Sequence, residues 1–197
     1  MASKLELYEQ LHDSRDEDWL NGRRKYIPAS AIDDFITKDS IKAELVRKSG
    51  NPINLSGCLA EKVMNRKAKR MFAILLYLKE PRDIKRLLND GFTDEDLPLV
   101  KHTEGLRSSL DPKKIFHLPK NWDRQTVDEF LEKQWMLLAP VFINYGEHMV
   151  LDPECPLPFS EIDERIYSHS SVIYKAKIHP SHQEGFEVSN ICVHTYN

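Results

Sequence analysis

The chain has 197 residues, of which 41% are hydrophobic and 30% are charged, a composition typical of a globular protein with a sizeable core. Its formal net charge of −3 leaves no overall basic excess to indicate nucleic acid or an anionic membrane as the partner. The first 30 residues contain no signal-like apolar run, and no window approaches the roughly 18 apolar residues of a membrane span. The cysteines, 3 in number and widely spaced, indicate no disulfide framework. We therefore expect an intracellular protein, cytoplasmic or nuclear, with no membrane partner.

The N-terminal 50 residues predict three helices. Apolar residues at near-helical spacing place the first over residues 3–12, after Ser3 as its cap. Pro28 opens the second, which runs through Phe35, and Thr37 caps the third, over residues 40–48. Between the first two helices lies a basic cluster, Arg23-Arg24-Lys25. The cluster could contact a phosphate or a nucleic acid, but the four nearby acids favour a solvated loop.

Residues 56–79 predict the strongest element of the chain. A wide apolar stripe without a proline indicates one long helix. Four basic residues lie between the apolar ones: Arg66, Lys67, Lys69 and Arg70. They could lie on DNA or an anionic lipid, or they could form the outer face of an amphipathic helix whose aliphatic stems cover the edge of the core. The apolar opposite face and the acidic overall charge favour the second interpretation.

The segment over residues 81–120 is predicted to hold one short helix, a cap and a loop. Pro81 and Gly91 stand at the two ends of the short helix. The run Thr93-Asp-Glu-Asp96 is typical of a helix cap with acids in the first turn. Its carboxylates could also be proposed as a general acid and base or as metal ligands, but capping explains them without chemistry. Weak periodicity and two prolines predict a loop over residues 101–120.

The remaining chain predicts one more helix and a β segment. The helix begins at Asn121 or Asp123 and stops before Pro140. Residues 141–145 and 148–151 are expected to form a short hairpin around Gly146. Three prolines within residues 152–159 predict an extended connector, which is the candidate domain boundary. Residues 172–178 alternate apolar and polar side chains and are rich in β-branched and aromatic types, which predicts a half-buried strand.

Several motifs of this chain resemble those of filamentous-fungal serine/threonine protein-kinase-like proteins. The run from Tyr174 to His182 resembles the start of their kinase-like region, with Tyr174, Lys175 and Lys177 on the strand that follows the phosphate loop in a kinase small lobe. The upstream motifs that resemble the same family are, in chain order, Phe72-Ala-Ile-Leu-Leu76, Gly91-Phe-Thr-Asp-Glu-Asp-Leu-Pro98, Gln134-Trp-Met-Leu-Leu-Ala-Pro-Val-Phe142 and Cys155-Pro-Leu-Pro-Phe159. Together they span most of residues 27–182. In that family the helical region precedes a kinase domain, so the resemblance implies that only the first strands of the small lobe are present here.

The resemblance also implies that kinase chemistry is missing. A phosphate loop needs glycines because backbone N–H groups must approach the phosphates closely. The resemblance places Ile166, Ser168 and Ser171 at the three glycine positions. No lysine follows Lys177 to hold the α and β phosphates, and the catalytic lobe has no counterpart. We therefore expect no catalytic residue, no cofactor and no bound nucleotide.

One set of potential metal ligands occurs in the tail. The spacings His179-x-x-His182 and Cys192-x-His194 offer ligand types that zinc accepts. The two histidines belong to the run that already resembles the kinase-like family, and the whole set matches no standard zinc-finger spacing. We therefore expect no metal site, and keep these four residues as the weak candidate.

The sequence as a whole predicts a mainly α, α+β fold. It consists of a multi-helix domain over residues 1–151, for which a winged-helix-like arrangement is one option, a Pro-rich connector over 152–160, and a degenerate, truncated β-hairpin over 161–197 that resembles the start of a kinase small lobe. The favoured function is a non-catalytic regulatory or protein-interaction module whose exposed strand edges dock another protein by strand addition. One alternative is a DNA-binding winged-helix-like protein that uses the basic helix around Arg66 to Arg70. The other is a truncated kinase gene product without independent function.

Overall fold

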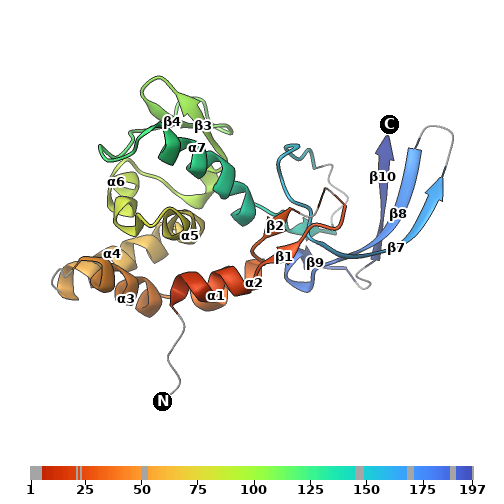
Figure 1. Cartoon of the computed structure of the whole chain (residues 1–197), viewed down its shortest axis with the longest axis horizontal. Helices are drawn as coiled ribbons and strands as arrows, with labels where there is room; N and C mark the ends of the chain where they lie inside the picture. The colour runs from red at the N-terminus through yellow and green to blue at the C-terminus, as the bar shows by residue number, and fades with distance from the viewer. Residues whose placement is uncertain are drawn as a thin grey trace, which may run out of the picture.

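The computed structural model describes residues 6–20, 22, 24–49, 53–144, 149–167, 171–186 and 190–196. Within them the chain forms a helical body and an antiparallel sheet that extends away from it (Figure 1). The mainly α, α+β fold predicted from the sequence is confirmed, whereas the winged-helix-like arrangement stays a prediction. The helices of the body are α1 (Leu7–Asp13), α2 (Ala29–Phe35), α3 (Lys38–Ser49), α4 (Ile53–Asn65), α5 (Lys69–Tyr77), α6 (Ile84–Asn89) and α7 (Arg124–Lys133), with the 3₁₀ turns η1 (Pro81–Asp83), η2 (Asp94–Asp96) and η3 (Gln134–Leu137).

Helix α5 is the centre of the helical body. Every residue from Met71 to Leu78 is buried, and α5 contacts α1, α2, α4, α6 and α7 (Figure 1). A helix that is packed on all sides must be apolar all round rather than along one stripe. This requirement explains the unbroken apolar run of α5 and its place among the other helices.

The prediction of one helix over residues 56–79 is wrong, because the chain turns between α4 and α5. Lys67 adopts a left-handed conformation with φ of 50°, and the amide of Ala68 donates to the carbonyl of Val63 at 3.0 Å. A straight helix of that length would extend about 36 Å. The turn instead places α5 inside the body, where both of its faces are buried, and this burial outweighs the left-handed conformation of a single lysine.

The prediction of a loop over residues 101–120 is also wrong. Strands β3 (Leu99–His102), β4 (Gly105–Ser108) and β5 (Ile115–Phe116) form an antiparallel sheet in that order. Gly105 has φ of 149°, and a Cβ at this position would lie 2.3 Å from the carbonyl oxygen of Phe116. These strands are too short for sequence periodicity to indicate them, and they are held by pairing and by burial of Leu99, Leu106 and Phe116.

The last predicted helix is confirmed and continues as a 3₁₀ turn. The Asp123 carboxylate caps α7 by accepting from the amide of Thr126 at 2.8 Å, and η3 follows directly. The hairpin predicted over residues 141–151 is wrong: β6 (Phe142–Ile143) pairs in parallel with β9 (Gln183–Glu184), far away in the sequence. The predicted hairpin turn falls on residues 145–148, which lie outside the described residues.

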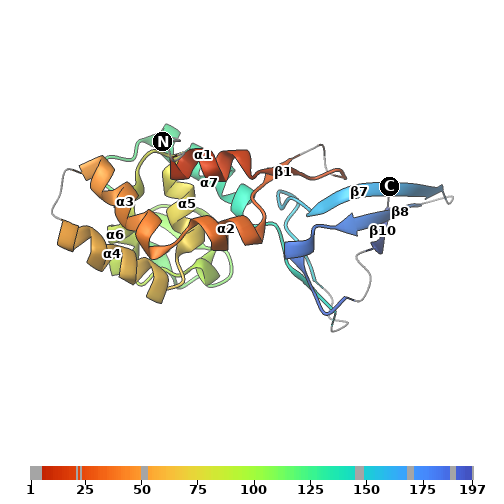
Figure 2. The ribbon, with the colours of Figure 1, turned by 90° about the horizontal axis from the view of Figure 1, so that it is seen from below.

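The sheet that extends from the body consists of β7 (Phe159–Tyr167), β8 (Ser171–Ile178) and β10 (Asn190–Tyr196) in the order β10-β8-β7. Figures 1 and 2 both show these strands projecting away from the helices. The strand predicted over residues 172–178 is confirmed: Ala176 and Ile178 are buried, whereas Lys175 is exposed. Strand β7 begins inside the segment that was predicted as the connector.

The base of this sheet is attached to the N-terminal half of the chain. Phe159, Ala176 and Ile178 form a small core with Leu20 and Leu157. Leu20 lies in the connection between β1 (Asp16–Glu17) and β2 (Lys25–Tyr26), which pair as a short ribbon. The sheet therefore packs on segments from both sides of the predicted domain boundary, and the Pro-rich connector is not the only link between the two parts.

Candidate interaction surfaces

The residues that resemble a kinase phosphate loop lie at the ends of β7 and β8. Ile166 is in β7, opposite Ile173 of β8, and Ser171 is the first residue of β8, opposite Tyr196 of β10. Ser168 lies outside the described residues. Ile166 and Ser171 therefore lie in extended, paired strands, where successive backbone N–H groups point to opposite sides and do not converge on one phosphate.

The kinase-like strand is the middle strand of the sheet. Lys175 is exposed opposite Cys192, and Lys177 forms an ion pair with Glu161 of β7 at 3.5 Å. Tyr174 lies opposite Arg165 of β7. The two lysines are thus placed on a β-sheet surface, and Lys177 already has an acidic neighbour.

The two outer strands of the sheet differ in how their edges are protected. Strand β7 has two register irregularities, at Phe159/Glu161 and at Ile162/Glu164, lies close to β1, and its nine residues include four with charged side chains. Strand β10 pairs with β8 in regular register over its whole length, and its seven residues, Asn-Ile-Cys-Val-His-Thr-Tyr, include none with Asp, Glu, Lys or Arg. Bulges and charges are the usual means by which edge strands avoid further pairing. Within the described residues, β10 has no second partner strand.

The junction between the sheet and the helical body is built around His182. This residue lies in the 3₁₀ turn η4 (Pro180–His182) and is only 1% exposed. Its Nε2 accepts a hydrogen bond from the amide of Ala29, the first residue of α2, at 3.0 Å. Its Nδ1 lies 2.9 Å from the carbonyl oxygen of Pro140, to which it donates. Both ring nitrogens of a neutral imidazole are therefore used.

Aromatic neighbours complete this junction. Tyr26 lies edge-on to His182, with ring centroids 5.4 Å apart, and His179 lies 5.7 Å from His182. Burial lowers the pKa of His182 to about 4 and also lowers the pKa of His179. Burial, together with the nearby Asp16 carboxylate, raises the pKa of Tyr26. All three rings are therefore neutral at physiological pH, and they join the sheet to α2 without an ion pair between them.

The four residues with zinc-ligand types are not brought together. In the β8–β10 register, Cys192 lies opposite Lys175 and His194 opposite Ile173. Because an extended strand rises about 3.3 Å per residue, these positions lie about 13 and 20 Å along β8 from His179, whereas zinc ligands approach the metal within about 2.3 Å. The side chains of Cys192 and His194 lie outside the described residues. Among the side chains that the structure describes, no group of three or more His, Cys, Asp or Glu could hold a metal ion.

The basic residues near the start of α5 are balanced by acids. Lys67 lies 3.8 Å from Glu95, and Lys69 lies 2.7 Å from Asp33. Lys67, Lys69 and Arg70 line an open pocket of about 290 Å³ that Asp33 and Asp94 also line. Arg66 is exposed in the turn before α5. The four cations therefore do not form one uninterrupted positive face of the kind that binds a phosphate backbone.

Two acidic residues have structural roles that the sequence did not reveal. Asp94 accepts from the amides of Arg70 and Met71, at 2.8 and 3.0 Å, and so caps α5 from another part of the chain. Burial raises the pKa of Asp94 to about 6. Asp18 is fully buried and accepts from the amides of Leu20 and Leu157, which ties the β1–β2 ribbon to the connector. The long-range roles have no local signal, because the amides of Arg70 and Met71 lie more than 20 residues from Asp94, and the amide of Leu157 lies 139 residues from Asp18.

Comparisons of the chain with family models, with curated proteins and with solved structures found no match. No helix in the described part of the chain has the length and apolar character needed to span a membrane.

Proposed function

We propose that this protein is an intracellular, non-catalytic protein-interaction module, related to the N-terminal region of fungal kinase-like proteins, that binds a partner by strand addition at β10. The observation that carries the proposal is the contrast between the two edges of one sheet. Strand β7 has bulges, charges and a neighbouring strand. Strand β10 is regular and uncharged, and it is rich in residues that favour strands.

The small core under this sheet supports the same function. Three residues of the sheet, Phe159, Ala176 and Ile178, are buried at its base, and the strands then extend beyond the helical body (Figure 2). A three-stranded sheet gains stability from each further strand that pairs with its edge. A partner strand on β10 would add a backbone ladder without any change in the helical body.

The proposal includes the absence of phosphoryl transfer. Nucleotide binding in a kinase requires a glycine-rich cradle and a lysine on the third strand. Ile166 and Ser171 occupy two of the positions that a kinase fills with glycine, and both lie within paired strands. Thermal unfolding with and without Mg-ATP tests this part: we expect unchanged unfolding temperatures, and clear stabilisation by Mg-ATP would contradict the proposal.

The strand-addition part is tested with two neighbouring proline variants, Cys192→Pro and Val193→Pro. Successive backbone N–H groups of a strand point to opposite sides, so one variant loses a bond to β8 and the other loses only the outward donor. A fluorescein-labelled peptide with the sequence of β10 serves as an uncharged strand probe. We expect saturable binding of the probe to the wild-type chain and its loss in the variant that keeps wild-type thermal stability. Equal binding to the wild type and that variant would contradict docking at β10.

A further inference from the structure

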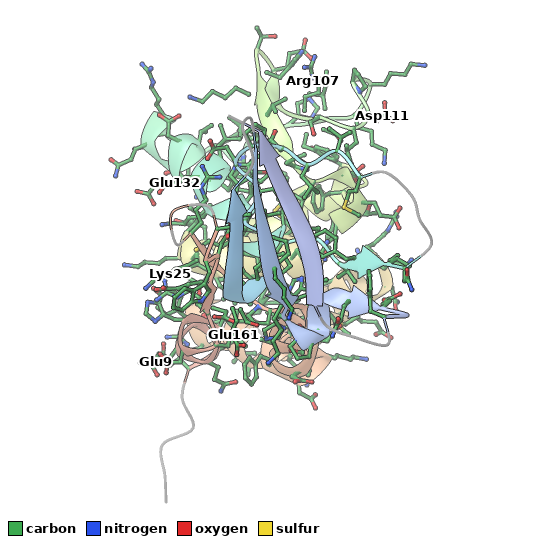
Figure 3. The ribbon with its side chains drawn as sticks, turned by 90° about the vertical axis from the view of Figure 1, so that its right-hand side faces the viewer. Glu9, Lys25, Arg107, Asp111, Glu132 and Glu161 are labelled. Atoms are coloured by element: carbon green, nitrogen blue, oxygen red, sulfur yellow. The ribbon has the colours of Figure 1, made fainter. Side chains whose placement is uncertain are left out.

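A groove on another side of the molecule combines a basic wall with an apolar floor. It measures about 590 Å³ and is lined by Arg15, Arg24, Lys25, Leu131, Glu132, Trp135, Met136, Glu154 and Pro156. These residues come from the β1–β2 ribbon, from α7 and η3, and from the connector. Figure 3 shows Lys25 and Glu132 on the same flank of the molecule. A groove of this size suits a short segment of a bound molecule.

The walls of the groove are fixed by contacts between distant segments. The amide of Ile27, which follows β2, donates to the carbonyl of Met136 at 2.8 Å. Arg24 donates to the carbonyl of Pro153 at 2.5 Å and lies 3.4 Å from the Glu154 carboxylate. The ribbon is thereby joined to η3 on one side and to the connector on the other, so the groove is present before any ligand binds.

The floor of the groove exposes large apolar side chains. Leu131, Trp135 and Met136 are only half-buried, and no described residue accepts a hydrogen bond from the indole N–H of Trp135. Half-exposed tryptophan and methionine side chains are common in peptide-binding surfaces, because they offer a large contact area and adapt to different partners. The floor therefore suits one apolar side chain of a bound segment.

The wall of the groove carries cations that have no acidic partner. Within the part of the chain that the structure describes, no carboxylate lies within 4 Å of the Lys25 ammonium or of the Arg15 guanidinium. Arg15 instead donates to the carbonyl of His12 at 2.8 Å. Of the two acids that line the groove, Glu154 is paired with Arg24. Glu17 lies opposite Lys25 in the β1–β2 ladder but is not among the residues that line the groove. The lining itself has three cations and two acids, so it is positive although the chain is acidic overall.

We propose that this groove binds a peptide segment that carries anionic side chains next to an apolar one. The apolar side chain lies on Leu131, Trp135 and Met136, and the anionic groups lie toward Arg15 and Lys25. The Arg-Arg-Lys cluster of the sequence thus supplies two residues of a peptide site, Arg24 as a wall anchor and Lys25 as a contact. This groove is separate from the β10 edge, so the experiment on one proposed site can give a negative result while the experiment on the other is positive.

The test is fluorescence polarisation of the full chain with a labelled probe peptide, Gly-Asp-Glu-Leu-Phe-Asp-Glu-Gly. Three further probes replace the acids by lysine, replace Leu-Phe by Ser-Ser, or replace the acids next to Leu-Phe by phosphoserine. We expect saturable binding of the acidic probe and at least about tenfold weaker binding of the lysine and serine probes, which corresponds to about 1.4 kcal/mol. Tighter binding of the phosphoserine probe would identify phosphate as the preferred anion, and weaker binding would identify carboxylate.

A matched pair of charge reversals assigns the binding to the groove. Lys25→Glu should weaken the binding of the acidic probe about tenfold, because the substitution replaces an attraction between opposite charges by a repulsion between like charges. Lys85→Glu, on the exposed face of α6, makes the same change in net charge and should leave the affinity unchanged. Equal effects of the two variants, equal binding of the lysine probe, or binding of a short DNA duplex in place of the peptide would overturn the proposal.

Discussion

Replacement of His182 by phenylalanine should weaken the attachment of the sheet to the helical body. The variant keeps a ring of similar size against Tyr26 but removes both hydrogen bonds, from the Ala29 amide and to the Pro140 carbonyl. Each buried polar group left without a partner costs about 1–3 kcal/mol. We therefore expect the free energy of unfolding at pH 7.5 to fall by about 2–4 kcal/mol.

The effect of this variant should also depend on pH. The pKa of His182 is about 4 in the folded protein, below its ordinary value of 6.5. Between these values the unfolded chain binds the proton more tightly, so the stability due to neutral His182 is complete above about pH 6.5 and is lost as the pH falls toward 4. The pKa difference corresponds to about 3 kcal/mol. The difference in free energy of unfolding between the wild type and His182→Phe should therefore become small near pH 4.

Urea unfolding of the wild type, His182→Phe and the partly exposed control His102→Phe, at several pH values between 4 and 7.5, measures this effect. The compared quantity is the difference in free energy of unfolding between wild type and variant at each pH, because the contributions of other titrating groups are common to both proteins and cancel. His102→Phe should change stability by less than about 0.5 kcal/mol. A loss below about 1 kcal/mol for His182→Phe at pH 7.5, or a loss that stays constant with pH, would refute the role assigned to this residue.

Three further variants test other parts of the fold. Asp94→Asn should remove about 3 kcal/mol from the free energy of unfolding at low pH, because the pKa of this carboxyl is raised to about 6 in the folded protein. This contribution is present below pH 4 and is lost as the pH rises toward 6. Urea unfolding at pH 4 and 7 would show the loss, and a pH profile equal to that of the wild type would contradict it. Gly105→Ala should lower stability by about 2 kcal/mol or more, because its Cβ would lie 2.3 Å from the Phe116 carbonyl oxygen; an unchanged melting temperature would refute the close approach. Gln134→Ala should cost about 2–4 kcal/mol, because the side chain bonds both the amide and the carbonyl of buried Leu99, and a loss below about 1 kcal/mol in urea unfolding would show that water replaces these bonds.

The helices were the part of the fold that the sequence predicted well. The segments around α1, α2, α3, α6 and α7 combine amphipathic spacing with a cap or with a proline or glycine at an end, and these signals act within a few residues of one another. The Asp123 cap of α7 is such a local device. Strand β8 was also predictable, because Ala176 and Ile178 are buried, whereas Lys175 is exposed and Lys177 is only partly buried.

The errors arose where residues far apart in the sequence decide the structure. The turn between α4 and α5 depends on burial of α5 among the other helices and on Asp94, which caps α5 from 24 residues away. Strand β6 is fixed by its parallel partner β9 rather than by a neighbouring hairpin strand. Strands β3 and β5 have only four and two residues, so pairing rather than periodicity defines them.

The features of the candidate sites also divide into those that the sequence determines and those that only the folded structure determines. The sequence by itself determined the absence of glycine from residues 166–177 and the uncharged composition of β10, because these depend only on residue types and their order. The tertiary structure decided that Arg24 and Lys25 share a groove with Trp135 and that the acids Asp33 and Glu95 balance the basic residues near α5. Hydrogen bonds and ion pairs depend on distances of a few ångströms, and the folded chain, not the sequence spacing, sets those distances.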